Sequence, residues 1–147
     1  YGNLPTSDMS LLYQRHNVFV LPTKGEGWGL PLIEAAAAGL PIITTMWSGN
    51  TEFLNPIKSS VMPVEYDMVP VDCSEYQSFY PTEDQDWGTW AQPRPQSIVQ
   101  ALLYVCDFFP ELKSHAVANS DIIRRDFSWT QSANTAMKML QKRGLLK

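Results

Sequence analysis

The chain has 147 residues, of which 44% are hydrophobic and 18% charged, and this composition is that of a globular protein and not of a disordered one, with a length that fits one domain. The net charge of −4 gives no electrostatic reason to expect nucleic acid or an anionic membrane as a partner. No apolar run is long enough for a transmembrane segment, and two cysteines without a disulfide framework favour a reducing, cytoplasmic compartment.

The N-terminal part predicts a helix followed by a strand. Ser7 or Asp8 is placed to cap a short helix. Its inward face would carry Met9, Leu12 and Tyr13. The apolar run at residues 18–21, stopped by Pro22, then predicts a buried strand.

A glycine turn (residues 25–29) and an alanine-rich helix of about ten residues follow. Gly39 ends the helix as its cap, and residues 41–45 predict a second buried strand. Strand, turn, helix and strand together predict a right-handed βαβ unit with parallel strands. The glycine turn would then lie at the carboxyl end of a strand, where such sheets bind ligands.

The glycine turn has the chemistry of an anion site. Gly25, Gly27 and Gly29 allow positive φ and close approach of a ligand to the backbone, and amides at the head of a helix favour phosphate. Glu26 and Glu34 flank this site, and a carboxylate accepts hydrogen bonds from the vicinal hydroxyls of a ribose or sugar. A nucleotide-sugar combines both groups. The alternative is that Glu26 is a solvated turn residue and Glu34 a surface residue of the helix.

A second turn (residues 45–50) follows the second strand at the same sheet edge. Ser48, Gly49 and Asn50 could therefore line the same pocket, or could simply form a helix cap and turn. Asn50 or Thr51 would open a short helix that Pro56 stops. Lys24 could bind phosphate or could simply be a solvated lysine, and Thr23, at the end of the first strand, is a candidate for contact with a nucleotide base or phosphate.

Residues 55–96 form a region rich in proline and aromatic residues within the domain. Short extended pieces at 61–64 and 69–71 predict the third strand. The region is either a folded surface cover or a mobile rim of the site. Its aromatic residues are Tyr76, Phe79, Tyr80, Trp87 and Trp90. Asp84 and Asp86 form a D-x-D triplet, and two carboxylates at this spacing can hold a divalent cation; we interpret the triplet as a chance match and predict no metal site.

The C-terminal part predicts helices. Pro95 suits a first helical position, Pro110 ends that helix, and a second helix spans about 112–126. Ser128 and Gln131 fit a capping box for the last helix. Its predicted inner stripe is Trp129, Ala133, Ala136, Met137 and Leu140.

Residues 25–35 read G-E-G-W-G-L-P-L-I-E-A, with Glu26 and Glu34 in E-x7-E spacing. This segment resembles the signature of family-4 retaining glycosyltransferases. The similarity extends over most of the chain, through residues 11–23, 39–45, 47–54, 90–93 and 127–129.

The resemblance implies an α/β fold: a partial Rossmann-like, three-layer domain with a short parallel sheet flanked by helices, corresponding to the C-terminal half of a GT-B donor domain. Residues 1–147 would form this nucleotide-sugar-binding domain, incomplete at its N-terminus. The resemblance assigns Glu34 to the ribose, Glu26 to donor-sugar hydroxyls, and the backbone of Trp28, Gly29 and Leu30 to the donor. It implies no metal and no cofactor beyond the nucleotide-sugar substrate.

The expected activity is transfer of a sugar from a nucleoside-diphosphate sugar to an acceptor hydroxyl with retention of configuration. The residues provide no protein nucleophile. The acceptor-binding half and an Arg/Lys pair for the pyrophosphate do not occur in these 147 residues, so the isolated chain is expected to bind donor weakly without turnover. The alternatives are a non-catalytic nucleotide-sugar binding module and an interaction domain that uses the aromatic residues between 76 and 90.

Overall fold

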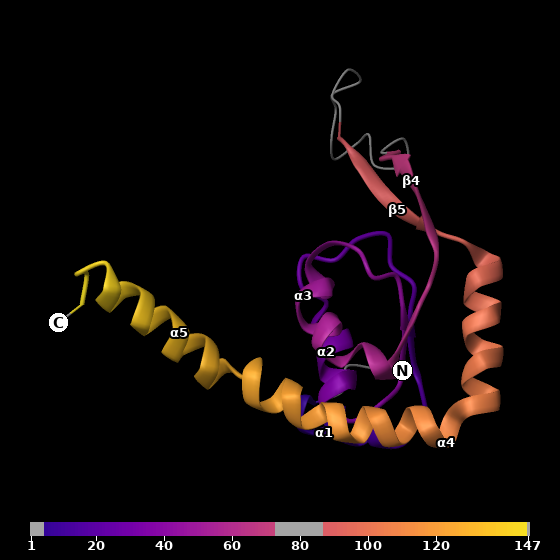
Figure 1. Ribbon diagram of the computed structural model, residues 1–147, viewed down its shortest axis with the longest axis horizontal. Helices are drawn as coiled ribbons and strands as arrows, with labels where there is room; N and C mark the ends of the chain where they lie inside the picture. Colours follow the sequence, from indigo (N-terminus) through magenta and orange to yellow (C-terminus); the bar gives the residue numbers. More distant parts are fainter. Residues whose placement is uncertain (1–4, 73–86, 147) are drawn as a thin grey trace.

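Three short parallel strands lie at the centre of the computed structural model, which describes residues 5–72 and 87–146 (Figure 1). Strand β1 (Phe19–Leu21) pairs with β2 (Ile42–Thr44), and β2 pairs with β3 (Val61–Pro63). Both pairings are parallel, with Ile42 opposite Phe19 on one side and Val61 on the other. The predicted α/β fold with a short parallel sheet flanked by helices is confirmed.

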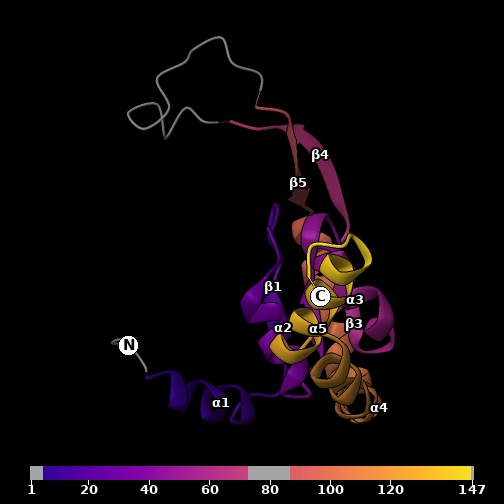
Figure 2. The same ribbon diagram turned by 90° about the vertical axis from the view of Figure 1, so that its left-hand side faces the viewer.

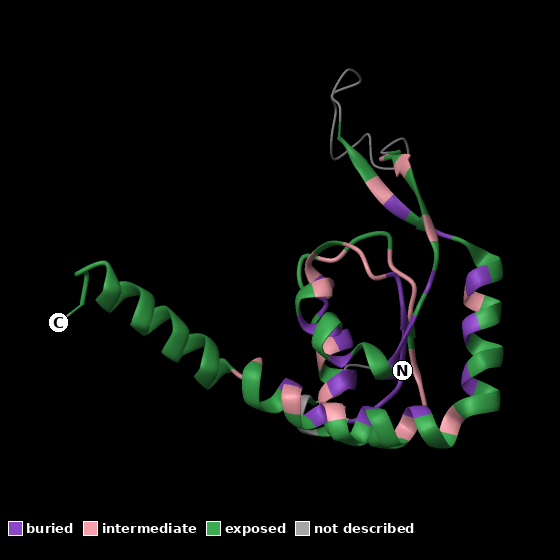
Figure 3. Ribbon diagram, viewed as in Figure 1, coloured by how far each residue is buried: buried purple, intermediate pink, exposed green. Residues whose placement is uncertain are grey.

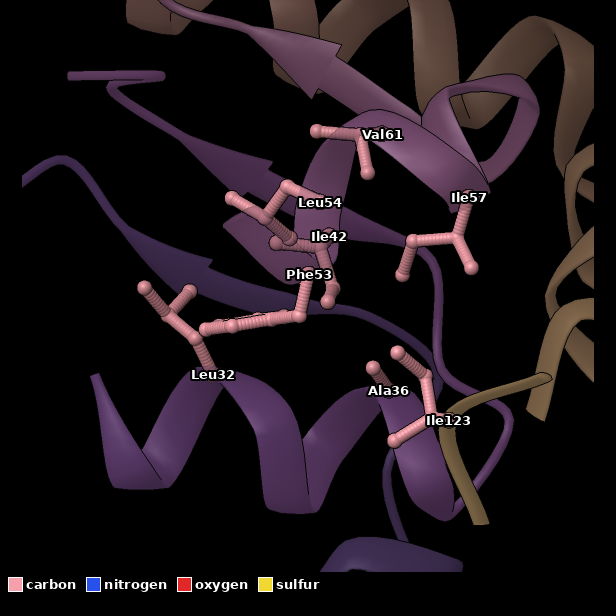
Figure 4. Close-up of a cluster of buried hydrophobic side chains, with 8 residues drawn as sticks. All are labelled: Leu32, Ala36, Ile42, Phe53, Leu54, Ile57, Val61 and Ile123. Carbon is pink, nitrogen blue, oxygen red and sulfur yellow. The ribbon is translucent and has the colours of Figure 1, made fainter. Parts of the chain in front are cut away.

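Helices cover both faces of this sheet. Ile42 and Ile43 point to opposite faces because side chains alternate along a strand. On the first face, α2 (Leu30–Ala37) and α3 (Thr51–Leu54) pack on the sheet (Figure 4). Eight buried residues form this cluster: Leu32, Ala36, Ile42, Phe53, Leu54, Ile57, Val61 and Ile123. On the other face, Ile43 packs with buried side chains of α4 (Pro95–Asp126).

Helix α1 (Thr6–Gln14) begins directly after Pro5, so neither Ser7 nor Asp8 is its cap. It joins the rest of the domain through Tyr13, which is buried with Ala35 and Leu40. Met9 packs against this cluster, as predicted, whereas Leu12 is exposed.

Between β2 and β3 the chain is helical from Ser48 to Ser60. A 3-10 turn, η1 (Ser48–Asn50), leads into α3, and a second 3-10 segment, η2 (Asn55–Ser60), follows without a gap. The α-helix runs from Thr51 to Leu54, as predicted, but Pro56 does not stop the helical structure, which continues as η2. Pro56 lies in the first turn of η2, where its missing N–H costs no hydrogen bond.

A separate two-stranded ribbon rises from the domain (Figure 2). Strand β4 (Tyr66–Pro70) pairs antiparallel with β5 (Thr89–Pro93), and Val69 lies opposite Trp90. The third strand of the parallel sheet is therefore β3 alone, and the extended piece predicted at 69–71 belongs to this ribbon. Asp84, Asp86 and the aromatic residues at 76–80 lie outside the described residues.

Helix α4 bends sharply, and both of its arms are visible in Figure 1. The break is at Phe108, whose φ of −117° and ψ of 20° are not helical. Pro110 follows two residues later, in the first turn of the second arm, so the helix is interrupted before the proline and not ended by it.

Helix α5 (Trp129–Lys142) begins as predicted, because the Ser128 hydroxyl accepts a hydrogen bond from the Gln131 amide at 3.2 Å. Its predicted inner stripe is wrong. No residue of α5 is buried, and the helix extends away from the domain (Figure 3). Trp129 is 87% exposed.

Candidate functional site

The glycine turn connects the carboxyl end of β1 with the first residue of α2, as predicted. Gly29 precedes the helix with a φ of 85° and accepts hydrogen bonds from the amides of Leu32 and Ile33. Gly25 and Gly27 do not have positive φ, so only Gly29 uses the left-handed conformation that we expected of all three. Its φ is unfavourable for any residue with a side chain.

The amides of residues 26–30 form the open part of this turn. None of them donates a hydrogen bond to any of the residues that the structure describes. They lie at the positive end of the α2 dipole. A row of free N–H groups at the head of a helix is a site for phosphate or another anion.

The opposite end of α2 is held in place by several donors. The C-cap is Ala38 and not Gly39 as predicted; Gly39 follows it with a φ of 71° and donates its amide to the Ala36 carbonyl. The Lys113 ammonium donates to the Gly39 carbonyl at 2.7 Å, and Arg124 donates to the Ala37 carbonyl. Cations at this end complement the helix dipole and fix α2 relative to α4.

Glu34 lies one turn into α2, and its carboxylate is positioned by Tyr13. The Tyr13 hydroxyl donates to Oε2 of Glu34 at 2.9 Å. Burial, and next the neighbouring Glu34 carboxylate, raise the pKa of Tyr13 well above its ordinary value. Tyr13 therefore remains a hydrogen-bond donor, and Oε1 of Glu34 is left without a donor among the described residues.

A cavity of about 390 Å³ adjoins Glu34 between α2 and the start of α5. Its lining is largely aromatic and apolar, with the Glu34 carboxylate and the Ser132 side chain as polar groups. The lining residues are Trp28, Leu30, Ile33, Glu34, Phe127, Trp129 and Ser132. Glu26 is not one of them, so the idea that both acids serve one ligand stays a prediction.

The Trp28 indole packs against two phenylalanines. Its ring centroid lies 5.5 Å from that of Phe53 and 6.3 Å from that of Phe127. Its exposed fraction is 38%, so one edge remains at the cavity. Leu30, whose backbone was assigned to the donor, is 56% exposed.

The second turn meets the glycine turn through its backbone. The Glu26 carbonyl accepts hydrogen bonds from the Gly49 amide at 3.1 Å and from the Ser48 hydroxyl at 2.9 Å. A Cβ on Gly49 would lie 2.0 Å from the Gly27 carbonyl oxygen, so no other residue fits there unless one of the two turns moves. Ser48 has a φ of 73°, a strained conformation for serine. Ser48 and Gly49 thus lie beside the predicted site, where they shape the glycine turn.

Two residues of this region were not recognised as partners from the sequence. Tyr13 was assigned to the core alone. A tyrosine that faces inward needs a hydrogen-bond partner for its hydroxyl. This requirement is the signal from which the bond to Glu34 could have been predicted. Lys24 was considered, but its contact with Trp90, whose ring centroid lies 4.2 Å from the ammonium, was not.

Within residues 5–72 and 87–146 no three His, Cys, Asp or Glu side chains are grouped so that they could hold a metal ion. None of the helices in those ranges has the length and apolarity that crossing a bilayer requires.

Comparison with known proteins finds similarity to a family model and to one relative. The family model described as glycosyl transferases group 1 matches residues 1–66, which include the glycine turn, both acids and the second turn. A particular relative is O-antigen chain mannosyltransferase B from Escherichia coli, which is 40% identical over 42 residues. That stretch is 29% of this chain and 11% of the relative. No solved structure matches the chain.

Proposed function

We propose that this chain forms the donor-binding part of a retaining glycosyltransferase of GT-B architecture, which transfers a sugar from a nucleoside-diphosphate sugar to an acceptor hydroxyl. The row of open amides at the head of α2, with the Tyr13-bound Glu34 carboxylate one turn further on, carries the proposal. The match to group 1 glycosyl transferases covers these residues and supports the same reaction class.

Each part of the site has a role in the proposal. The amides of the glycine turn and the α2 dipole bind the diphosphate and stabilise the charge on the leaving group. The free oxygen of Glu34 accepts a hydrogen bond from a ribose hydroxyl, and Glu26 binds hydroxyls of the donor sugar. Both acids bind and position, and retention proceeds by a front-face route that the leaving phosphate assists.

The proposal also covers the metal requirement, the domain organisation, the location and the donor sugar of the enzyme. The reaction is proposed to be metal-independent because amides and the helix dipole supply the positive potential at the diphosphate. Residues 1–147 are proposed to form the donor domain, and an acceptor-binding half is proposed to complete the active site. The composition and cysteine content support a cytoplasmic location. The relative's name makes a mannose donor the first to test.

The experiment is a calorimetric titration of the wild-type chain and the Glu34→Ala variant with UDP-, GDP- and ADP-sugars. Loss of a hydrogen bond from a hydroxyl to a charged group predicts about ten- to hundredfold weaker binding. Glu111→Ala, which removes an exposed acid of α4, is the matched control. Equal affinity of the wild type and Glu34→Ala would contradict the assignment of Glu34 to the ribose.

A further inference from the structure

The ribbon formed by β4 and β5 touches the chain directly before the glycine turn. The Ala91 amide of β5 donates to the Lys24 carbonyl at 3.0 Å, and the Lys24 ammonium lies 4.2 Å from the centroid of the Trp90 ring. The ribbon thus holds both the backbone and the side chain of Lys24.

The base of the ribbon is itself fixed to the domain. The Arg94 guanidinium forms a forked contact with Asp67, whose pKa it lowers, and a second contact with Glu65 at 3.2 Å. The Glu65 amide donates to the Ser97 hydroxyl at 2.9 Å, at the start of α4. Ala91 is fully buried. Lys24 is therefore contacted by a ribbon whose base is hydrogen-bonded to the start of α4.

The glycine turn is held from two sides as a result. The ribbon fixes Lys24 at its start, and the second turn fixes the Glu26 carbonyl two residues later. The open amides follow immediately, from residue 26 to residue 30. A backbone segment fixed at these points keeps its N–H groups aimed in one direction, which is what pre-organised anion binding requires.

Lys24 is the one cation in residues 23–30, and its side chain is exposed. The face of the Trp90 ring attracts the ammonium and limits its freedom, while the side away from the ring stays open to solvent. Lys24 is only a few residues away in the chain from the amides of the glycine turn, so its charge can attract an anion that these amides bind.

We propose that the β4–β5 ribbon belongs to the donor site: Trp90 and Ala91 hold Lys24 so that its ammonium binds the anionic diphosphate of the donor. This inference rests on the proposed function. Lys24 is the binding residue, whereas Trp90 and Ala91 are positioning residues that act through it.

The test compares ligands with and without the diphosphate. The 147-residue chain is titrated with UDP-glucose, GDP-mannose and ADP-glucose, and then with uridine, guanosine and adenosine. Lys24→Ala should weaken binding of the preferred nucleotide-sugar about fivefold to tenfold, because an exposed charge-assisted contact is lost. Affinity for the matching nucleoside should not change, and Lys24→Arg should retain most of the wild-type affinity.

The positioning role is tested at Trp90. Trp90→Ala should weaken nucleotide-sugar binding about twofold to fivefold, the range expected from an exposed cation–π contact. Trp90→Phe keeps an aromatic face and should bind nearly as the wild type does. The Trp90 indole N–H resonance of ¹⁵N-labelled protein should shift in Lys24→Ala and on addition of nucleotide-sugar. Lys58→Ala, which removes a lysine lining another cavity, should match the wild type in all titrations.

The outcomes separate this inference from the proposed function. If the wild type binds none of the nucleotide-sugars, the proposed function fails and this inference fails with it. If the wild type binds and Glu34→Ala weakens binding, but Lys24→Ala binds as tightly as the wild type, the role of the ribbon alone is overturned. An equal loss of nucleoside affinity in Lys24→Ala would also overturn it, because the effect would then not involve the diphosphate.

Discussion

The second arm of α4 and helix α5 follow one another in the chain, yet only one of them packs on the domain (Figure 3). The α4 arm buries a stripe at helical spacing, formed by Leu112, Ala116, Ser120 and Ile123. Helix α5 has a comparable apolar stripe, and none of its residues is buried.

This difference shows what a periodic pattern does and does not determine. Apolar residues at a spacing of three and four place one face of a helix inward if a partner exists. The α4 arm finds its partner in α2 and the sheet, where Ile123 joins the cluster around Phe53. Helix α5 has the same kind of signal, but none of its residues is buried against such a surface. The pattern therefore predicts the helix and its apolar face, and packing must be established from the structure.

The largest expected effect tests this contrast directly. Phe53 is fully buried and contacts the rings of Trp28 and Phe127, so Phe53→Ala should lower the free energy of unfolding by about 3–5 kcal/mol. Trp129→Ala removes a larger side chain from α5 and should change it by no more than about 0.5 kcal/mol. Urea unfolding measures both values.

Equal losses of unfolding free energy in Phe53→Ala and Trp129→Ala would contradict this difference between the α4 arm and α5. A large effect of Trp129→Ala would mean that α5 packs in solution. If Phe53→Ala does not fold, Phe53→Leu provides a smaller, measurable loss at the same site.

The sequence was sufficient for β1, α2 and β2 because each signal there is local, whereas only one of the two pieces predicted for the third strand belongs to the parallel sheet. The apolar run before Pro22, the glycine turn and the helix-ending Gly39 lie within about twenty residues of each other. Strand β5 was missed because Trp90 stands in a polar segment and pairs with Val69, far back in the chain. The end of the helix was predicted at Pro110. The break occurs at Phe108 instead, because a proline disturbs the turn that precedes it.

The candidate site was predictable to a similar extent. Parallel strands end at one sheet edge, so the meeting of the glycine turn and the second turn followed from topology. The hydrogen bonds that shape it did not, because they join backbone atoms such as the Glu26 carbonyl, which no side-chain pattern reports. The bond between Tyr13 and Glu34 joins two helices and depends on how α1 packs.

A smaller effect is expected where the two turns meet. Gly49→Ala places a Cβ 2.0 Å from the Gly27 carbonyl oxygen, so one turn must shift, and the free energy of unfolding should fall by about 1–3 kcal/mol. Gly27→Ala is the matched control, since its Cβ would meet no atom within 4 Å. Similar unfolding free energies for the two variants, measured in urea, would show that the turns are not in close contact.

The smallest effect concerns Tyr13, the point where α1 joins the packed part of the domain. Because the pKa of Tyr13 is raised in the folded state, the folded and unfolded chains both keep this proton below pH 10, the ordinary value for tyrosine. Above pH 10 the unfolded chain loses the proton first and binds fewer protons, so stability falls as the pH rises.

Tyr13→Phe should lower the free energy of unfolding by about 1 kcal/mol at pH 7 through the lost hydrogen bond. The advantage of the wild type over this variant should then decrease above pH 10 in urea unfolding. Glu34→Gln should retain most of the decrease, because burial is the larger cause of the shift and the Glu34 charge the smaller one. A loss of stability above pH 10 that is equally steep in Tyr13→Phe would assign it to other groups and would place the Tyr13 hydroxyl in contact with water.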